Sequence, residues 1–192
     1  MRASDAAVAA LNEAIALHER VRNAGLAATV AAADAIVKSL RLGGKVLVFG
    51  NGGSAADAAH TATELVGRFV RERRGYAAIA LTTDGCVLTS VSNDYGYDQL
   101  FARQIEALGR PGDVALGITT SGTSANVVCG LQTARTLQLT TIALTGRDGG
   151  PAGRAADIHV NVPSEVTPRV QEVHMALLHI VCDLVEKDLS AL

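Results

Sequence analysis

The sequence predicts an α/β protein in which helices cover both faces of a parallel β-sheet. From residue 43 onward, short apolar segments alternate with longer segments of helical character. Each apolar segment leads directly into a polar loop, and several of these segments are apolar at nearly every position. Strands of that kind are typical of a parallel sheet that is buried on both faces. Ligands of such sheets bind at the carboxyl ends of the strands.

The individual elements follow in order along the chain. Two segments rich in Ala, Leu and Val, residues 5–22 and 26–41, are expected to be helices, and Gly43 and Gly44 end the second one. A repeating pattern of strand, loop and helix then begins. The expected strands are residues 45–49, 77–81, 114–118, 141–144 and 158–162, and the expected helices are residues 55–71, a segment containing 87–91, and residues 125–137 and 167–189.

Length and composition predict one folded domain. A chain of 192 residues with 48% hydrophobic residues is long enough to bury a core, and this composition excludes a disordered chain. Alanine is the commonest residue, aromatic residues make up only 3%, and tryptophan is absent, so the core must consist of small and branched aliphatic side chains. We expect a single domain over residues 1–192, with helices for subunit packing in 1–42 and an α/β core in 43–192.

Charge and segment patterns exclude several classes of partner. The net charge of -2 lacks the basic field that nucleic-acid binding requires. The first residues do not resemble a signal peptide, and polar residues interrupt the alanine-rich segment 24–37 well before it reaches membrane-spanning length. We therefore expect a cytoplasmic protein without nucleic-acid or membrane partners. Cys86, Cys129 and Cys182 form no Cys-x-x-Cys pair and are expected to be buried, reduced thiols.

The loop after the third expected strand is the strongest candidate for phosphate binding. Residues 119–126 read Thr-Thr-Ser-Gly-Thr-Ser-Ala-Asn, which places five hydroxyl groups and a glycine between a strand and a helix. Hydroxyls beside the free N–H groups at a helix start form a phosphate cradle without a lysine. The alternative is an ordinary helix cap with spare hydroxyls. The segment lacks the Gly-Lys-Ser/Thr of a Walker loop.

A second small-residue loop follows the first expected strand. Residues 50–54 read Gly-Asn-Gly-Gly-Ser, in which the glycines allow a ligand to approach the backbone, while Asn51 and Ser54 add polar groups. A tight turn followed by a helix cap explains this segment about as well. Neither loop matches Gly-x-Gly-x-x-Gly, so a dinucleotide ligand is not favoured.

Three side chains on two helices are candidates for proton transfer or metal binding. His60 and Glu64 lie four residues apart and so share one helix face, although a surface ion pair would have the same spacing. On the last helix, His179 stands among aliphatic residues, where a histidine with a satisfied hydrogen bond in the core is the alternative. His174 lies on another face and is expected to be structural. Cys182 is a weak candidate metal neighbour of His179 because no second thiol accompanies it.

Several linked motifs together resemble one known family. They run in order over nearly the whole chain, which makes the resemblance far more specific than any single motif. The chain is similar to the phosphoheptose isomerases of the sugar isomerase (SIS) domain superfamily in Gly50-Asn51-Gly52-Gly53-Ser54-Ala55-Ala56-Asp57-Ala58, His60-x-x-x-Glu64, Asn93-Asp94-Tyr95-Gly96, the loop 119–126, Leu144-Thr145-Gly146 and Thr167-Pro168-Arg169-x-Gln171-Glu172-x-His174.

This resemblance implies a flavodoxin-like sheet, a homotetramer with active sites near subunit contacts, and the conversion of sedoheptulose 7-phosphate into D-glycero-D-manno-heptose 7-phosphate. It makes Glu64 the base that moves a proton between C1 and C2, and His179 its acid/base partner. It also implies that some members bind zinc, one ion per subunit, through positions matching His60, Glu64, Gln171 and His179. The substrate-binding residues implied in this way are Asn51, Gly52, Gly53, Ser54, Glu64, Asn93, Asp94, Thr119, Thr120, Ser121, Ser124 and Gln171.

The chain departs from the family pattern at a few positions, and other functions remain open. Thr119 and Thr123 stand where many relatives have serine and asparagine, and both substitutions are compatible with a phosphate loop. Pro168 stands where some members carry an aspartate, so it has no expected catalytic role. The alternatives are a non-catalytic binding protein of the same fold, like the relative that binds the bacterial replication initiator, and an isomerase of another ketose phosphate. A further open question is whether a neighbouring subunit completes the site.

Overall fold

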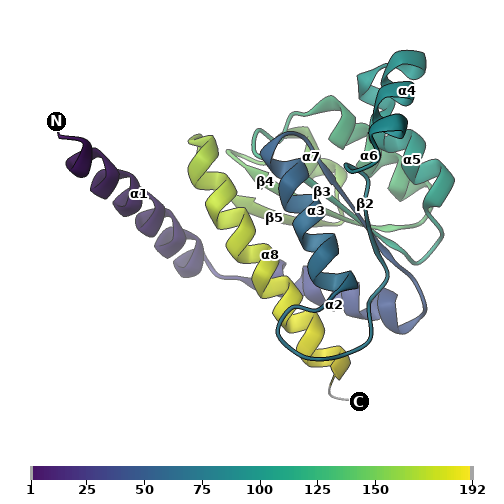
Figure 1. Cartoon of the computed structure of the whole chain (residues 1–192), viewed down its shortest axis with the longest axis horizontal. Helices are drawn as coiled ribbons and strands as arrows, with labels where there is room; N and C mark the ends of the chain where they lie inside the picture. Colours follow the sequence, from purple (N-terminus) through teal and green to yellow (C-terminus); the bar gives the residue numbers. More distant parts are fainter. Residues whose placement is uncertain (1, 191–192) are drawn as a thin grey trace.

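The computed structural model describes residues 2–190 and has a five-stranded sheet at its centre (Figure 1). All neighbouring strands are parallel, and their order is β2-β1-β3-β4-β5. This is the strand order of flavodoxin-like folds, so the predicted fold class is confirmed. The strands are β1 (Val46–Gly50), β2 (Ala78–Ala80), β3 (Val114–Thr119), β4 (Thr140–Gly146) and β5 (Ile158–Val162).

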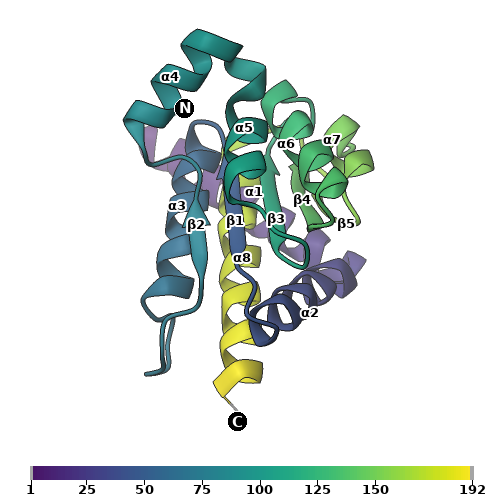
Figure 2. The same ribbon diagram turned by 90° about the vertical axis from the view of Figure 1, so that its right-hand side faces the viewer.

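Helices form a layer on each face of the sheet. In Figure 2, α5 and α6 lie in front of the strands and α8 lies behind them. The layer containing α8 also holds α2 and α3, whereas α4 and α7 belong with α5 and α6. The helices are α1 (Ala3–Ala24), α2 (Ala27–Arg41), α3 (Gly53–Val66), α4 (Gly85–Tyr95), the short 3-10 helix η1 (Tyr97–Gln99), α5 (Leu100–Leu108), α6 (Ala125–Thr136), α7 (Gly150–Ala155) and α8 (Thr167–Ser190).

Alternate residues of each strand fill the two cores. In β1, Val46 and Val48 join the core that includes α2 and α8, while Phe49 points to the opposite core. Because glycine has no side chain, Gly117 and Gly130 leave room for the Phe49 ring, and a Cβ atom on Gly130 would lie only 2.9 Å from it. Small residues therefore let one of the few aromatic rings pack at the centre of an aliphatic core.

The parallel register brings the two candidate ligand loops together. Gly50 pairs with Ile118 across β1 and β3, so the loop 50–54 and the loop 119–126 leave the sheet side by side. Both loops lead into helices whose first N–H groups have no partner within the helix. The fold thus places the polar loops at the carboxyl edge, as expected for ligand binding in an open parallel sheet.

The helix boundaries show where sequence patterns were insufficient. The helix predicted for residues 55–71 ends at Val66, and the missed elements are η1, α5 and α7. The prediction was wrong beyond Val66 because the N–H groups of Phe69, Val70 and Arg71 donate to the Glu186 carboxylate of α8 instead of to their own helix. A bond between residues more than 100 positions apart cannot be seen in local periodicity.

Glu186 is the central residue of this tertiary connection. Its side chain is almost completely buried and accepts three backbone N–H bonds of 2.8–3.1 Å. The Arg73 Nε also donates to it at 3.1 Å, and the Arg73 guanidinium lies 4.0 Å from the Tyr76 ring. These donors hold the pKa of Glu186 below its usual value, although burial itself acts in the opposite direction.

Two further expectations concern the surface and the cysteines. No helix within residues 2–190 has both the length and the apolar character needed to cross a membrane. The three cysteines are free, but only Cys182 is buried. Cys86 is exposed because it lies in the first turn of α4, where its N–H donates to Asp84, so the expectation that all three are buried was wrong.

Replacing Glu186 by alanine is expected to lower the free energy of unfolding by about 3–5 kcal/mol, because the Arg73 Nε and three backbone N–H groups would lose this buried carboxylate as their acceptor. Urea unfolding at fixed protein concentration measures this change. The control is Glu106→Ala, which removes a half-exposed ion pair with Arg103 and should cost less than about 1 kcal/mol. Equal unfolding midpoints for the two variants would contradict the central role of Glu186.

Candidate active site

The candidate site begins with the packing of α3 against α8. The two helices lie side by side and run in the same direction (Figure 1). Near their starts, the Gln171 amide lies over Gly53, where a Cβ atom would come within 2.2 Å of the Gln171 nitrogen. Further along, His179 faces His60. Residues spaced seven or eight apart on each helix therefore form successive rungs between α3 and α8.

His60, Glu64 and His179 form one polar cluster on these helices. The His60 Nε2 atom lies 2.9 Å from His179 Nε2 and 3.2 Å from Glu64 Oε1. The Glu64 side chain is mostly buried, with 20% exposed, whereas the His60 side chain is 43% exposed. The cluster thus combines a carboxylate with two imidazoles, and these are the side-chain types that enzymes use most often for general acid and base catalysis.

The loop after α3 supports this cluster from one side. Phe69 lies on this loop, and its ring centroid is 5.3 Å from that of His179. The Phe69 N–H donates to Glu186, and Arg73 donates to the Glu64 carbonyl at 2.8 Å. The Glu186 network therefore fixes the backbone beside Glu64 and the ring that packs on His179. The local sequence around Phe69 does not indicate this role because its partner lies on a distant helix.

The donor atoms of the cluster are suitable for zinc. Zinc binds imidazole nitrogen and carboxylate oxygen at about 2.0–2.1 Å, which puts neighbouring donors roughly 3.3 Å apart in a tetrahedron. The two distances from His60 Nε2, 2.9 and 3.2 Å, are close to that value. Even so, no group of three or more His, Cys, Asp or Glu side chains within residues 2–190 is already arranged around a metal position. Gln171, the fourth predicted ligand, lies against Gly53 instead.

Asp57 is a titratable residue of α3 that the sequence analysis did not select. It is 8% exposed, and its Oδ2 has no hydrogen-bond partner among the described residues. Burial raises the pKa of Asp57 to about 6, and the charge of nearby His60 counteracts part of this increase. Asp57 lies one turn before His60 and therefore adds a second carboxyl group to the surroundings of the cluster.

The predicted phosphate loop is a compact group of hydroxyls at the start of α6. Thr119 is buried, and its Oγ1 lies 2.9 Å from Ser124 Oγ and 3.2 Å from Ser121 Oγ. Ser121 Oγ also accepts from the N–H and the hydroxyl of Thr123. Thr120 is half-buried beside them. Ser124 is the N-cap of α6 but its side chain does not cap the helix, so the helix start remains available to an anion.

A glycine holds this loop against its neighbour. Gly122 has a φ of +71°, and a Cβ atom there would lie 2.5 Å from the Gly149 carbonyl oxygen. The Gly122 carbonyl accepts from the Ala152 N–H at 2.9 Å. Only glycine combines this left-handed backbone with so close an approach. The loop therefore rests on the segment between β4 and α7.

The glycine loop and the segment after α4 meet at Asn51. Its amide exchanges hydrogen bonds with the Asn126 amide, and its Oδ1 also accepts from the Tyr97 hydroxyl. Gly52 and Gly53 are exposed beside it, whereas Ser54 is only 3% exposed. The exposed Asn93 and Asp94 lie in the last turn of α4, where Asn93 Nδ2 donates to Asp94 Oδ1. Asn126 and Tyr97 were not predicted as site residues.

The predicted residues thus form two groups. One group, at the carboxyl edge of the sheet, comprises the glycine loop and the hydroxyl loop, with Gln171 over Gly53. The other group is His60, Glu64 and His179. Glu64 follows Gly53 by about 16 Å along α3, given a rise of 1.5 Å per residue. The chain therefore brings the members of each group together, and the two groups occupy different positions along α3.

His174 and Cys182 of α8 lie in buried surroundings that indicate a structural role. His174 is completely buried and donates through Nε2 to the Thr145 carbonyl. Burial lowers its pKa to about 4, opposed by that hydrogen bond, so the ring is neutral at neutral pH. For Cys182, burial is the main cause that raises the thiol pKa to about 12. A thiol that stays protonated is a poor metal ligand.

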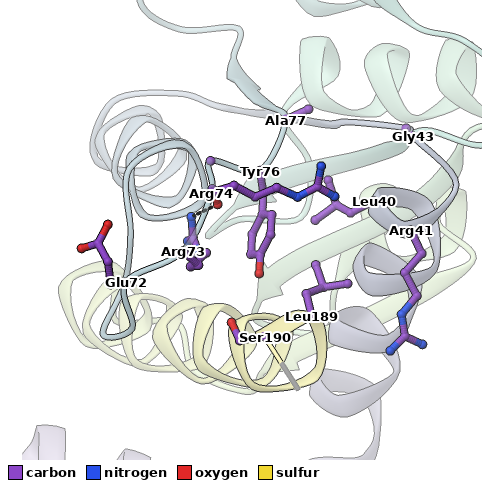
Figure 3. Close-up of a pocket in the computed structure, with 12 residues that line it drawn as sticks. Leu40, Arg41, Gly43, Glu72, Arg73, Arg74, Tyr76, Ala77, Leu189 and Ser190 are labelled. Carbon is purple, nitrogen blue, oxygen red and sulfur yellow. Dashed lines mark hydrogen bonds between the residues drawn. The ribbon is translucent and has the colours of Figure 1, made fainter. Parts of the chain in front are cut away.

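A separate hollow lies at the opposite end of the sheet. Its volume is about 680 Å³, and it contains none of the predicted site residues. Figure 3 shows Arg41, Arg73, Arg74 and Tyr76 around it. Arg73 is paired with Glu186, and Arg41 is paired with Asp188. These carboxylates neutralise two of the three arginines, so the charge distribution does not favour this hollow as an anion site.

Comparison with known proteins gives a consistent assignment. The SIS domain family model matches residues 11–146. A phosphoheptose isomerase from Roseiflexus sp. (strain RS-1) is 54% identical over 160 residues, which are 83% of this chain and 81% of that protein. The structure of a phosphoheptose isomerase from Neisseria gonorrhoeae has a TM-score of 0.92 at 42% identity, and one from Francisella tularensis has 0.93 at 39%. Both alignments cover 97% of this chain and 100% of the other.

These identities and TM-scores indicate more than a shared fold, because high sequence identity and close structural agreement extend over most of the chain. The chain therefore belongs to the SIS domain family and, within it, to the phosphoheptose isomerases.

Proposed function

We propose that this chain is an aldose-ketose isomerase that converts D-sedoheptulose 7-phosphate into D-glycero-D-manno-heptose 7-phosphate. The observation that carries the proposal is the convergence of Glu64 and His179 on His60, whose Nε2 lies 3.2 Å from Glu64 Oε1 and 2.9 Å from His179 Nε2. The high identity to phosphoheptose isomerases supports the same reaction. A carboxylate and an imidazole are the groups that proton transfer between adjacent carbon atoms requires.

The proposed reaction moves protons but no other atoms. Glu64 takes the proton from C1 of the open-chain ketose, which forms an enediol across C1 and C2, and returns it to C2 on the same face. His179 transfers the hydroxyl proton from the oxygen on C1 to the oxygen on C2. The Phe69 and His60 rings both pack against the His179 imidazole, with centroids 5.3 and 5.1 Å away. The product is the aldose, with unchanged composition.

Phosphate binding is assigned to the loop 119–124. Its clustered hydroxyls and the start of α6 provide several donors for an anion. The backbone of Gly52 and Gly53 at the start of α3 lies next to this loop and is exposed to a ligand. We assign the sugar hydroxyls to this backbone, to Gln171 and to the exposed pair Asn93 and Asp94.

We also propose that zinc binds to the cluster, one ion per subunit. His60, Glu64 and His179 have the right donor atoms, and a change in the side-chain torsion of Gln171 would be required for the fourth ligand. When bound, zinc supplies a Lewis acid that polarises the sugar carbonyl. Without it, the same side chains retain the proton transfers described above.

The first helix supports a homotetramer. In Figure 1, α1 extends away from the body of the subunit, and among its residues only Leu17 and Val21 are buried. Val8, Leu11 and Ile15 form an apolar stripe with 57–65% of each residue exposed. A groove between α1 and α8 adds Val173 and Ile180 to this apolar surface, among other residues. Contact with further copies of the chain would bury this surface.

Assembly of subunits would also affect how the phosphate loop and the Glu64 cluster are combined in one site. The Glu64 backbone lies about 16 Å along the α3 axis from Gly53, so a substrate has to connect the carboxyl edge of the sheet with a cluster farther along this helix. A site shared between subunits can combine the phosphate loop of one copy with the Glu64 cluster of another. We therefore propose that subunit contacts complete the active site.

Glu64→Gln and His179→Gln are each expected to lower kcat by about 10²- to 10⁴-fold, because each removes one proton-transfer group. NMR of the sugar products after incubation with sedoheptulose 7-phosphate measures the change. Glu72→Gln is the matched control, since Glu72 is exposed and only pairs with Arg68 at 3.6 Å. Near-normal turnover in both of the first two variants would refute the proposed mechanism.

Removing a zinc ligand is expected to abolish most metal binding. His60→Ala should weaken zinc binding by at least about 100-fold. Changes to residues that only contact a metal ligand already cost about 10- to 100-fold in metal affinity, and loss of a direct ligand should cost at least as much. Metal content after dialysis, measured by mass spectrometry, gives the result without reference to activity. His18→Ala controls for general loss of a histidine, because His18 is exposed on α1 and contacts the Ala14 carbonyl. Equal zinc content in both variants would contradict this site.

Ile15→Asp is expected to reduce the assembly to smaller species and to lower turnover at the same time, because it places a charge in the apolar stripe. Sedimentation at micromolar concentration measures the size. The control is Leu42→Asp at the end of α2, which is also exposed but lies outside the stripe. The tetramer proposal fails if the unaltered protein sediments as a monomer.

A further inference from the structure

The amide pair formed by Asn51 and Asn126 connects the two ligand loops. Asn51 Nδ2 donates to Asn126 Oδ1 at 2.8 Å, and Asn126 Nδ2 donates back to Asn51 Oδ1 at 2.9 Å. Asn51 directly follows β1, and Asn126 lies in the first turn of α6, where it is only 1% exposed. A reciprocal pair of this kind has one favourable geometry, and its burial makes any loss of the bonds costly. It therefore sets the spacing between the glycine loop and the phosphate loop.

Tyr97 adds a third element to this connection. Its hydroxyl donates to the same Asn51 Oδ1 at 2.8 Å, while 56% of the residue is exposed. Tyr97 is the first residue of η1, which follows α4 after Gly96 and contacts both α4 and α6. The residues Asn93 and Asp94, assigned above to the sugar, lie on the same segment. The hydroxyl of Tyr97 thus adds a side-chain hydrogen bond between this segment and the two loops.

These bonds determine how Asn51 can act. Its Oδ1 already accepts two hydrogen bonds and one of its amide N–H groups is used, so only one side-chain N–H remains for a ligand. The side chain of Asn51 mainly holds its neighbours in place. The polar contacts of a ligand at this loop then come mostly from the backbone of Gly52 and Gly53.

We propose that Tyr97 is a positioning residue for the isomerase reaction, which holds Asn93 and Asp94 at a fixed distance from the phosphate loop through the Asn51–Asn126 pair. This rests on the proposed function. Removing the hydroxyl leaves both bonds between Asn51 and Asn126, so the phosphate loop keeps its place. The segment 93–99 loses its tether to Asn51. The sugar end of the substrate is then held less well, while the phosphate is held as before.

Tyr97→Phe tests this inference because it removes only the hydroxyl. We expect kcat to fall about three- to tenfold, the effect of one neutral hydrogen bond, with little change in the inhibition constant of inorganic phosphate. Amide hydrogen exchange of residues 93–99 should become faster, while exchange in residues 119–126 stays the same. The matched control is Tyr95→Phe, because Tyr95 is 55% exposed on the same segment and packs on Arg103.

Each result either supports or overturns the proposal. It is overturned if Tyr97→Phe equals the unaltered protein in kcat and exchange, if Tyr95→Phe causes the same loss, or if phosphate inhibition weakens by the same factor as kcat. The last result would show a general loosening of both loops. If the unaltered protein does not isomerise the sugar phosphate at all, the proposed function fails. In that case, unchanged exchange of residues 93–99 in Tyr97→Phe still refutes the tether, and faster exchange confined to them supports it.

Discussion

The structure of the site depends on the parallel packing of α3 and α8, which the buried carboxylate of Glu186 secures at one end. Three backbone N–H groups and Arg73 converge on this carboxylate. Because these donors belong to the chain immediately after α3, they fix where that helix ends relative to α8. His60 and His179, a few turns earlier, then meet at 2.9 Å. A displaced helix end would move both the Glu64 backbone and the Phe69 ring, since Glu186 and Arg73 hold them together.

The abundance of alanine has a consequence for the chemistry of the site. Small residues of α3, including Ala55, Ala59 and Ala62, let the helix pack closely with few competing side chains between the polar groups. Aromatic residues make up only 3% of the sequence, and Tyr97 contacts the glycine loop through a hydrogen bond from its hydroxyl to Asn51. Hydroxyls, amides and backbone N–H groups remain, and these are suitable for a sugar phosphate.

Sequence patterns predicted the sheet and most helices, because apolar strands and the glycines at their ends are local signals. They also selected His60, Glu64 and His179, which the structure brings together, although their roles remain a prediction. They failed where a partner is distant in sequence. The end of α3 depends on Glu186, and the role of Tyr97 depends on Asn51, 46 positions earlier. The short helix α7 has six residues, of which Gly150, Pro151 and Gly153 are typical of loops, so the sequence did not indicate a helix there.

Two separate sets of hydrogen bonds hold the two groups of predicted site residues. Glu186 organises the helices that carry His60, Glu64 and His179, whereas the Asn51–Asn126 pair organises the loops at the carboxyl edge of the sheet. The α3 helix connects them. It begins at the glycine loop, carries His60 and Glu64, and ends beside the residues that contact Glu186. Subunit packing can therefore combine the two groups without distorting either one. The exposed stripe of Val8, Leu11 and Ile15 on α1 is the apolar surface that we propose for such packing.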